Sequence, residues 1–191
     1  MSPGGHLVTT GLLCGAVHAL TGSAAMTAGV ALGGFLIDVD HAIDYVVLES
    51  RRDLRPAAFL RHFTEQRHRR VLLALHSYEL LALLALLAWL SNSTWVWGYV
   101  LGMSLHLPLD VVFNGQRLGL NLVPFYSFAH RARGGFRSDA LLGVTGPRPE
   151  PGGFWRGFFA EFVPPARAEA TAATAPIRPA RLSPTSRLAD A

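Results

Sequence analysis

The stretch VLLALHSYELLALLALLAWL, residues 71–90, is twenty residues long and almost entirely apolar. A helix of twenty residues is about 30 Å long at 1.5 Å per residue, which matches the hydrocarbon core of a bilayer. The whole chain is similarly apolar, because 50% of its 191 residues are hydrophobic and only 16% are charged. Ordinary soluble domains carry more charge than this. The stretch therefore predicts a helix that spans a membrane.

Three further apolar segments accompany this one, at residues 6–20, 23–37 and 95–113. Gly22-Ser23 and the tetrapeptide SNST at 91–94 leave short connections, which make the helices on either side antiparallel. The two N-terminal segments are marginal in length for a bilayer, which needs about 20 residues per helix. The sequence thus predicts an all-α fold: an integral membrane bundle of about four helices in two antiparallel hairpins.

The segment between the two predicted hairpins, residues 51–70, is strongly basic. Short loops rich in arginine stay on the cytoplasmic side of a membrane. We therefore predict a multi-pass protein of the bacterial inner membrane with residues 51–70 in the cytoplasm. A basic face next to apolar segments favours membrane lipid as a partner, and no nucleic acid is expected.

Near the C-terminus, aromatic residues recur at helical spacing. They are Phe154, Trp155, Phe158, Phe159 and Phe162. This spacing is typical of an interfacial helix on a membrane surface, and equally of a small satellite of the core. Residues 164–191 show no periodicity and are rich in Pro, Ala, Thr and Arg. They are predicted to be a disordered tail, which leaves residues 1–163 as the membrane-embedded domain.

Histidine and aspartate residues from four separate segments fall at one end of the predicted bundle. They are His6, Asp38, Asp40, His41, His76, His106 and Asp110. Carboxylates buried beside apolar segments need compensation, and a divalent cation supplies it. Aspartate and neutral histidine are ligands of zinc, so we predict a divalent metal site, most simply for Zn²⁺. Seven candidates exceed the four ligands of one tetrahedral zinc, so either two ions share them or some only support ligands.

His18 serves as an internal contrast, because it falls at the opposite end of the first segment and is predicted to be structural. Asp40 and Glu79 are the candidate catalytic residues, either of which could take a proton from a metal-activated water. Glu79 follows His76 by about one helical turn and could also be a ligand or support one. Its alternative role is to pair with an arginine of the basic segment.

The basic run RHFTEQRHRR at 61–70 allows two interpretations. It could be a solvated anchor that faces the lipid surface. Alternatively, His68, Arg69 and Arg70 could bind an anionic substrate group, because a guanidinium holds such a group with two parallel hydrogen bonds. His62 and His68 lie close enough in sequence to reach the site.

Several of these residues form recognisable motifs. They are GGHL at 4–7, IDVDH at 37–41, HRR at 68–70 with HS at 76–77, HLPLD at 106–110 and LVPF at 122–125. Their order resembles a family of inner-membrane-associated, metal-dependent hydrolases whose bacterial prototype is under LexA control. Ile37 stands where that family has proline, and the gap between His68 and His76 is longer here. The resemblance implies a hydrolytic site similar to the helical His/Asp sites of zinc phospholipase C and related zinc nucleases, without implying a substrate.

The sequence therefore predicts a membrane-bound, metal-dependent hydrolase. Its expected substrate is a phosphoester or other ester of a lipid or of an anionic, lipid-linked small molecule. The alternative is a non-enzymatic membrane protein in which the metal only joins the helices or the polar cluster forms an ion path. An open coordination position would favour the enzyme, and a closed shell of protein ligands would favour the structural role.

Overall fold

The computed structural model describes residues 1–143 and 153–160, and every regular element in this part of the chain is helical. The prediction of an all-α fold is confirmed. The predicted disordered tail, residues 164–191, lies outside the described residues, as does Phe162.

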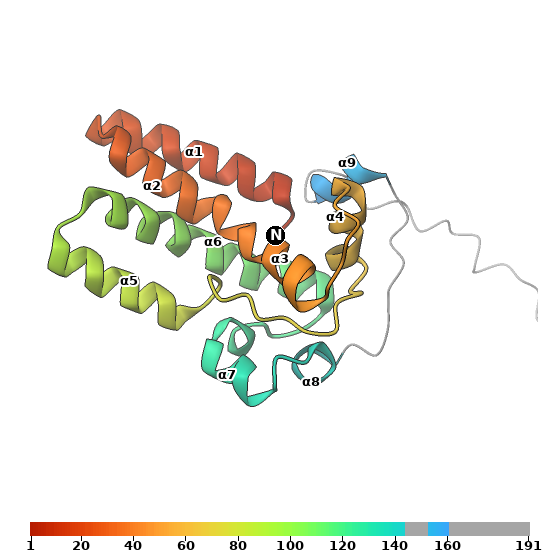
Figure 1. The fold of residues 1–191 in the computed structure, drawn as a ribbon. Helices are drawn as coiled ribbons and strands as arrows, with labels where there is room; N and C mark the ends of the chain where they lie inside the picture. Colours follow the sequence, from red (N-terminus) through yellow and green to blue (C-terminus); the bar gives the residue numbers. More distant parts are fainter. Residues whose placement is uncertain (144–152, 161–191) are drawn as a thin grey trace, which may run out of the picture.

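Four helices form two hairpins that lie side by side (Figure 1). They are α1 (Pro3–Thr21), α2 (Ala24–Gly34), α5 (Tyr78–Ser91) and α6 (Thr94–Leu118). Each hairpin turn begins with a residue in the left-handed conformation, Gly22 with φ 64° and Asn92 with φ 50°. Glycine and asparagine adopt this conformation at helix ends most readily. The side chain of Ser23 then accepts a hydrogen bond from the Met26 amide and so caps α2.

Helices α2 and α6 make the closest contact between the hairpins. A Cβ atom on Gly33 would collide with the Tyr99 carbonyl oxygen, and one on Gly102 with the Val30 carbonyl oxygen. Only glycine lets the two backbones approach this closely. This contact fixes the position of α6 along α2, and so places His106 beside Gly34 at the end of α2.

The prediction of a twenty-residue helix at 71–90 is wrong, because α5 begins only at Tyr78 and has 14 residues. Residues 71–77 contain no regular helix, and we call this segment the strap. His76, expected inside the helix, therefore lies before it. Within the described residues one helix, α6, is long and apolar enough to cross a membrane, and α2 and α5 are shorter apolar helices.

Short elements gather at one end of the hairpins (Figure 1). They are η1 (Leu36–Asp38), α3 (Val39–Ile43), η2 (Asp44–Leu48), α4 (Pro56–Thr64), η3 (Pro124–Tyr126), α7 (Phe128–Arg133), α8 (Ser138–Leu142) and α9 (Phe154–Phe158). The predicted aromatic segment forms α9, which packs against α4 and the start of α1. Trp155 nevertheless remains 68% exposed. The strap also lies at this end of the molecule, which contains the predicted metal ligands.

Candidate metal centre

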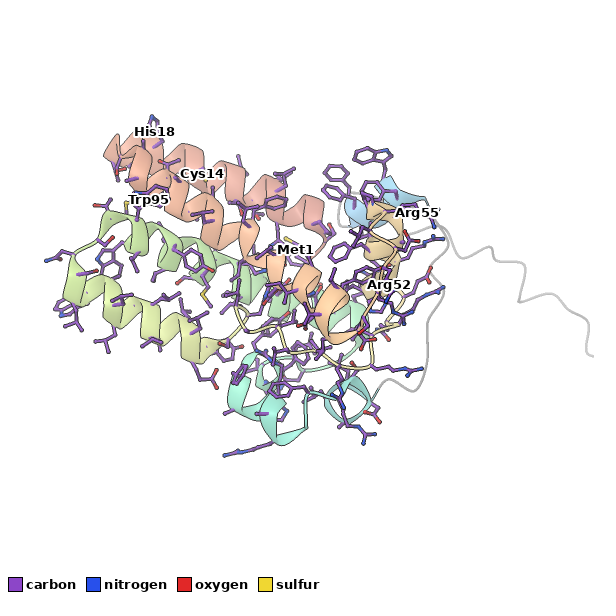
Figure 2. The ribbon with its side chains drawn as sticks, viewed as in Figure 1. Met1, Cys14, His18, Arg52, Arg55 and Trp95 are labelled. Atoms are coloured by element: carbon purple, nitrogen blue, oxygen red, sulfur yellow. The ribbon has the colours of Figure 1, made fainter. Side chains whose placement is uncertain are left out.

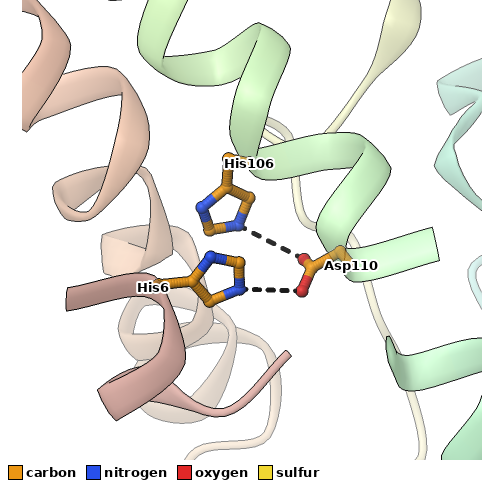
Figure 3. A group of neighbouring side chains, drawn as sticks. All are labelled: His6, His106 and Asp110. Carbon is orange, nitrogen blue, oxygen red and sulfur yellow. Dashed lines mark hydrogen bonds and ion pairs between the residues drawn. The ribbon is translucent and has the colours of Figure 1, made fainter. Parts of the chain in front are cut away.

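Helices α1 and α6 bring three of the predicted residues together (Figure 3). His106 and Asp110 are four apart on α6, and the Nε2 atom of His106 lies 3.2 Å from Asp110 Oδ2. His6 from α1 stacks on His106 with ring centroids 3.8 Å apart. Its Nε2 atom lies 2.9 Å from the other oxygen of Asp110, Oδ1. The pair on α6 keeps its helical spacing even though Pro108 lies between its members.

The orientation of His106 is fixed by a backbone carbonyl. Its Nδ1 atom lies 2.9 Å from the carbonyl oxygen of Gly34, at the end of α2. A carbonyl oxygen can only accept, so Nδ1 carries a hydrogen and donates it to Gly34. The Nε2 atom on the other side of the ring faces Asp110.

The strap positions His76 in the same way. Its Nδ1 atom lies 3.0 Å from Asp40 Oδ2, and Asp40 also accepts the Leu75 amide at 3.0 Å. Burial raises the pKa of Asp40, but the hydrogen bond and charge of His76 outweigh it and lower that pKa below its usual value. The ionised carboxylate accepts the Nδ1 hydrogen, so the Nε2 atom of His76 is directed at the centre. Carboxylates hold metal-binding histidines in this arrangement.

Four ligand atoms converge at this point: His76 Nε2, His106 Nε2, Asp38 Oδ1 and Asp110 Oδ2. The two Nε2 atoms are 2.9 Å apart. Asp38 Oδ1 lies 3.2 Å from His76 Nε2 and 3.6 Å from His106 Nε2. Asp110 Oδ2 lies 3.7 Å from His76 Nε2. Ligands about 2.0–2.1 Å from a tetrahedral zinc are about 3.3 Å from one another, and the distances from the two Nε2 atoms to each carboxylate oxygen are close to that value.

Two carboxylate oxygens beside these ring nitrogens favour a positive charge at this point. In the metal-free protein a proton on His76 supplies it. Burial would lower the pKa of His76, but hydrogen bonds with Asp38 and Asp40 raise it to about 10. Burial likewise raises the pKa of Asp38, yet His76 and His106 lower it below the usual range. A divalent ion would replace the proton.

The four residues differ in their access to solvent. His76, His106 and Asp110 are buried, whereas the side chain of Asp38 is 28% exposed. Asp38 and Asp110 line a cavity of about 430 Å³ that lies beside the centre. The centre is therefore closed on the helix side and reachable from the cavity, past Asp38.

The remaining predicted ligands adjoin the centre. His41 Nε2 lies 3.6 Å from Asp38 Oδ1, and burial together with His76 lowers the pKa of His41, which keeps the ring neutral. His6, His106 and Asp110 are close enough to hold an ion, and so are Asp40, His41 and His76. Asp40, predicted as both ligand and base, has one oxygen engaged by His76 and Leu75. Its other oxygen is buried without a partner among the described residues.

The structure places the other predicted catalytic residue, Glu79, away from the centre. Its carboxylate accepts from Ser127 Oγ at 2.6 Å and from the amides of Phe128 and Ala129. Because α5 starts at Tyr78, Glu79 lies in its first turn and caps the neighbouring helix α7. The structure therefore does not bring Glu79 together with the other predicted site residues.

Of the three predicted substrate contacts, only His68 reaches the cavity. Burial lowers its pKa to about 4, so the ring is neutral. Arg69 and Arg70 are exposed, and their backbone amides both donate to Glu49 Oε1 at 2.8 Å. They do not line the cavity. His18 lies at the far end of α1 from Met1, as predicted (Figure 2).

Arg131, on α7, is a functional residue that the sequence did not reveal. Its guanidinium is fully buried and donates to the carbonyl oxygens of Leu73 at 2.9 Å, His76 at 2.9 Å and Phe125 at 2.7 Å. It thereby holds the strap on both sides of its turn and places His76. No local pattern distinguishes it from the neighbouring arginine, Arg133.

The sequence pattern could have identified two further residues near the centre. Asn114 follows Asp110 by one turn of α6 and donates to Asp110 Oδ1 at 3.0 Å. Arg117 follows by about one further turn and lines the cavity. Their helical spacing from His106 and Asp110 could have identified both.

Comparison with known proteins gives no match: no protein-family model fits the chain, and no curated protein and no solved structure matches it.

Proposed function

We propose that this protein is a membrane-bound, metal-dependent hydrolase that acts on an ester, most directly a phosphoester, of a lipid or lipid-linked compound. The observation that carries the proposal is that His76 Nε2 and His106 Nε2 lie 2.9 Å apart and each lies 3.2–3.7 Å from Asp38 Oδ1 and Asp110 Oδ2, beside a cavity. The donor set of nitrogen and oxygen atoms suits zinc.

In this proposal the three buried side chains, His76, His106 and Asp110, hold the ion. Two histidines and one carboxylate form a ligand set of hydrolytic zinc sites, which keep one position open. The ion would acidify a water molecule and polarise the ester oxygen. Asp38, which faces the cavity, takes the proton and so has the role that the sequence assigned to Asp40. Asp40 instead holds the His76 ring in position.

The anionic part of the substrate would be met by Arg117 in place of Arg69 and Arg70. Arg117 lines the same cavity as Asp110, from the same helix. Its guanidinium can donate two parallel hydrogen bonds to a phosphate group. His68 also lines this cavity and can donate or accept as a neutral ring.

Exposed apolar side chains support the membrane location. They include Leu12, Leu20, Leu83, Leu86, Trp89, Leu90 and Trp95. Large exposed apolar patches are rare on soluble monomers. Trp89 lies in the last turn of α5 and Trp95 in the first turn of α6, and Trp95 is at the end of the hairpins away from Met1 (Figure 2). Tryptophan is enriched at membrane interfaces. We infer a multi-pass inner-membrane protein with residues 51–70 on the cytoplasmic side.

A structural metal site is the second candidate, because four protein atoms converge and could close the shell. The two functions differ in what Asp38 does. An enzyme needs Asp38 for proton transfer, whereas a structural site needs it as a fourth ligand.

The test is the zinc content of detergent-purified protein together with its hydrolysis of p-nitrophenyl phosphate and bis(p-nitrophenyl) phosphate. His106→Ala should lose both the metal and hydrolysis, while His18→Ala, at the far end of α1, should keep both. Asp38→Asn should retain zinc but hydrolyse at least about a hundredfold more slowly, as expected for loss of a general base. Loss of zinc from Asp38→Asn to the level of His106→Ala would favour the structural site.

A further inference from the structure

The cavity beside the centre lies among the end of α2, helix α4 and the second half of α6. Most of its wall is apolar. The apolar lining includes Phe35, Leu36, Phe59, Phe63, Leu118 and Phe125. Such a wall offers few partners to a water-soluble, highly charged molecule.

The same cavity reaches the metal centre directly. Asp38, His41 and Asp110 line it together with the apolar residues. A molecule in the cavity therefore places one part among aromatic and leucine side chains and another part beside the ligands. The part of the molecule that fills the apolar region of the cavity therefore sets the position of its ester group at the metal centre.

Three buried polar atoms of lining residues have no partner among the described residues: His41 Nδ1, Gln66 Oε1 and His68 Nδ1. His41 and His68 flank Phe63, whose ring centroid is 4.8 Å from that of His41 and 5.6 Å from that of His68. Polar side chains thus lie within the apolar wall on the side of the metal centre. The occupant that fits this cavity is therefore an amphiphile, with an apolar chain along the apolar wall and a polar group beside Asp38 and Asp110.

We propose that the cavity binds the aliphatic chain of the substrate, so that the ester cleaved at the centre is attached to a single alkyl chain held inside the protein. This rests on the proposed function and names its substrate class. At about 30 Å³ for a group the size of a water molecule and protein-like packing, the cavity has room for on the order of ten methylene groups. Chain length, more than the head group, then determines affinity.

The experiment measures binding of n-alkylphosphonates from butyl to tetradecyl to zinc-loaded protein in nanodiscs. Calorimetric affinities are referred to the free aqueous concentration of each probe, so that partition into lipid does not enter. Affinity should rise about fourfold per added methylene, the gain from burying one such group. It should stop rising near ten carbons, where the cavity is full.

Two variants fill the cavity from different walls, Leu36→Trp from η1 and Leu118→Trp from α6. Each should move the plateau to a shorter chain and weaken decylphosphonate binding at least tenfold, while butylphosphonate binds as before. Leu32→Trp is the matched control, because Leu32 is an exposed leucine one turn earlier that does not line the cavity. It should leave the whole series unchanged.

An affinity that does not depend on chain length, or an equal loss in Leu36→Trp and Leu32→Trp, overturns the chain-binding proposal. Either result leaves zinc binding and hydrolysis of short phosphoesters intact. Absence of any phosphonate binding to zinc-loaded protein instead counts against the hydrolase function itself. The two failures are thus distinguishable.

Discussion

The strap, residues 71–77, and helix α5, Tyr78–Ser91, belong to one apolar run, yet only the second part is helical. In α5 the backbone groups bond to one another. In the strap they bond to charged side chains: Asp44 Oδ2 accepts the amides of Leu72 at 2.7 Å and Leu73 at 3.1 Å. Arg131 donates to the carbonyls on the other side.

The difference shows that apolar composition alone does not decide whether a segment becomes a helix. Every buried backbone group needs a partner, and a helix is only the commonest way to supply one. Where carboxylates and a guanidinium from other elements supply the partners, the chain stays irregular. The irregular backbone of the strap turns the His76 side chain toward His106. A continuous helix over the same residues would not by itself give His76 this direction.

The largest effect should follow from Arg131→Ala, which removes all three carbonyl partners and a buried positive charge. We expect destabilisation by a few kcal/mol, because each buried carbonyl left without a partner costs about 1–3 kcal/mol, together with loss of zinc. Hydrogen–deuterium exchange should increase in the strap while α5 stays protected.

Arg131→Lys keeps the charge but cannot bridge three carbonyls, so it should retain stability better than it retains zinc. Arg133→Ala removes an exposed arginine of the same helix and should change stability by less than about 0.5 kcal/mol. Equal effects of Arg131→Ala and Arg133→Ala would show that the strap does not depend on Arg131.

A smaller effect concerns pH. The pKa of His76 is raised to about 10, so the protonated ring stabilises the metal-free fold fully below its unfolded pKa of about 6.5. That stabilisation is lost as the pH rises through 10. Metal-free protein should therefore lose up to a few kcal/mol of folding stability between these pH values, because His76 is protonated in the folded state and neutral in the unfolded state. Zinc-loaded protein should not, since the ion replaces the proton.

Thermal unfolding of both forms at pH 6.5 and 9.5 measures this difference, with His76→Gln as the control that has no proton to lose. If the stability of the metal-free wild type depends on pH in the same way as that of His76→Gln, the positive charge assigned to His76 is wrong. Zinc affinity should also increase with pH in this range, because the proton must leave before the metal binds.

The smallest effect should come from Glu79→Ala. Glu79 caps α7 from the first turn of α5, so its loss should cost about 1 kcal/mol, the usual value for a cap. Zinc content and hydrolysis should remain near those of the wild type. A loss of hydrolysis of a hundredfold or more at unchanged zinc content would restore Glu79 as a catalytic base.

The sequence predicted the helical fold and the gathering of His6, Asp38, His76, His106 and Asp110 because both follow from apolar segments joined by short turns. It misplaced the start of α5 because the partners of the strap are distant in sequence: Asp44, Asp40 and Arg131. The partners of Glu79 could not be predicted for the same reason, since the direction of its side chain depends on where α5 begins. No sequence pattern around Arg131 indicates that it holds the strap.

X-ray absorption spectroscopy of the zinc-loaded protein tests the central claim most directly, because it reports the atoms bound to the metal. The claim predicts nitrogen and oxygen ligands at about 2.0–2.1 Å, with the scattering of two imidazole rings, and a loss of bound zinc in His106→Ala. A shell of oxygen atoms without imidazole scattering, or a spectrum that His106→Ala leaves unchanged, would contradict it.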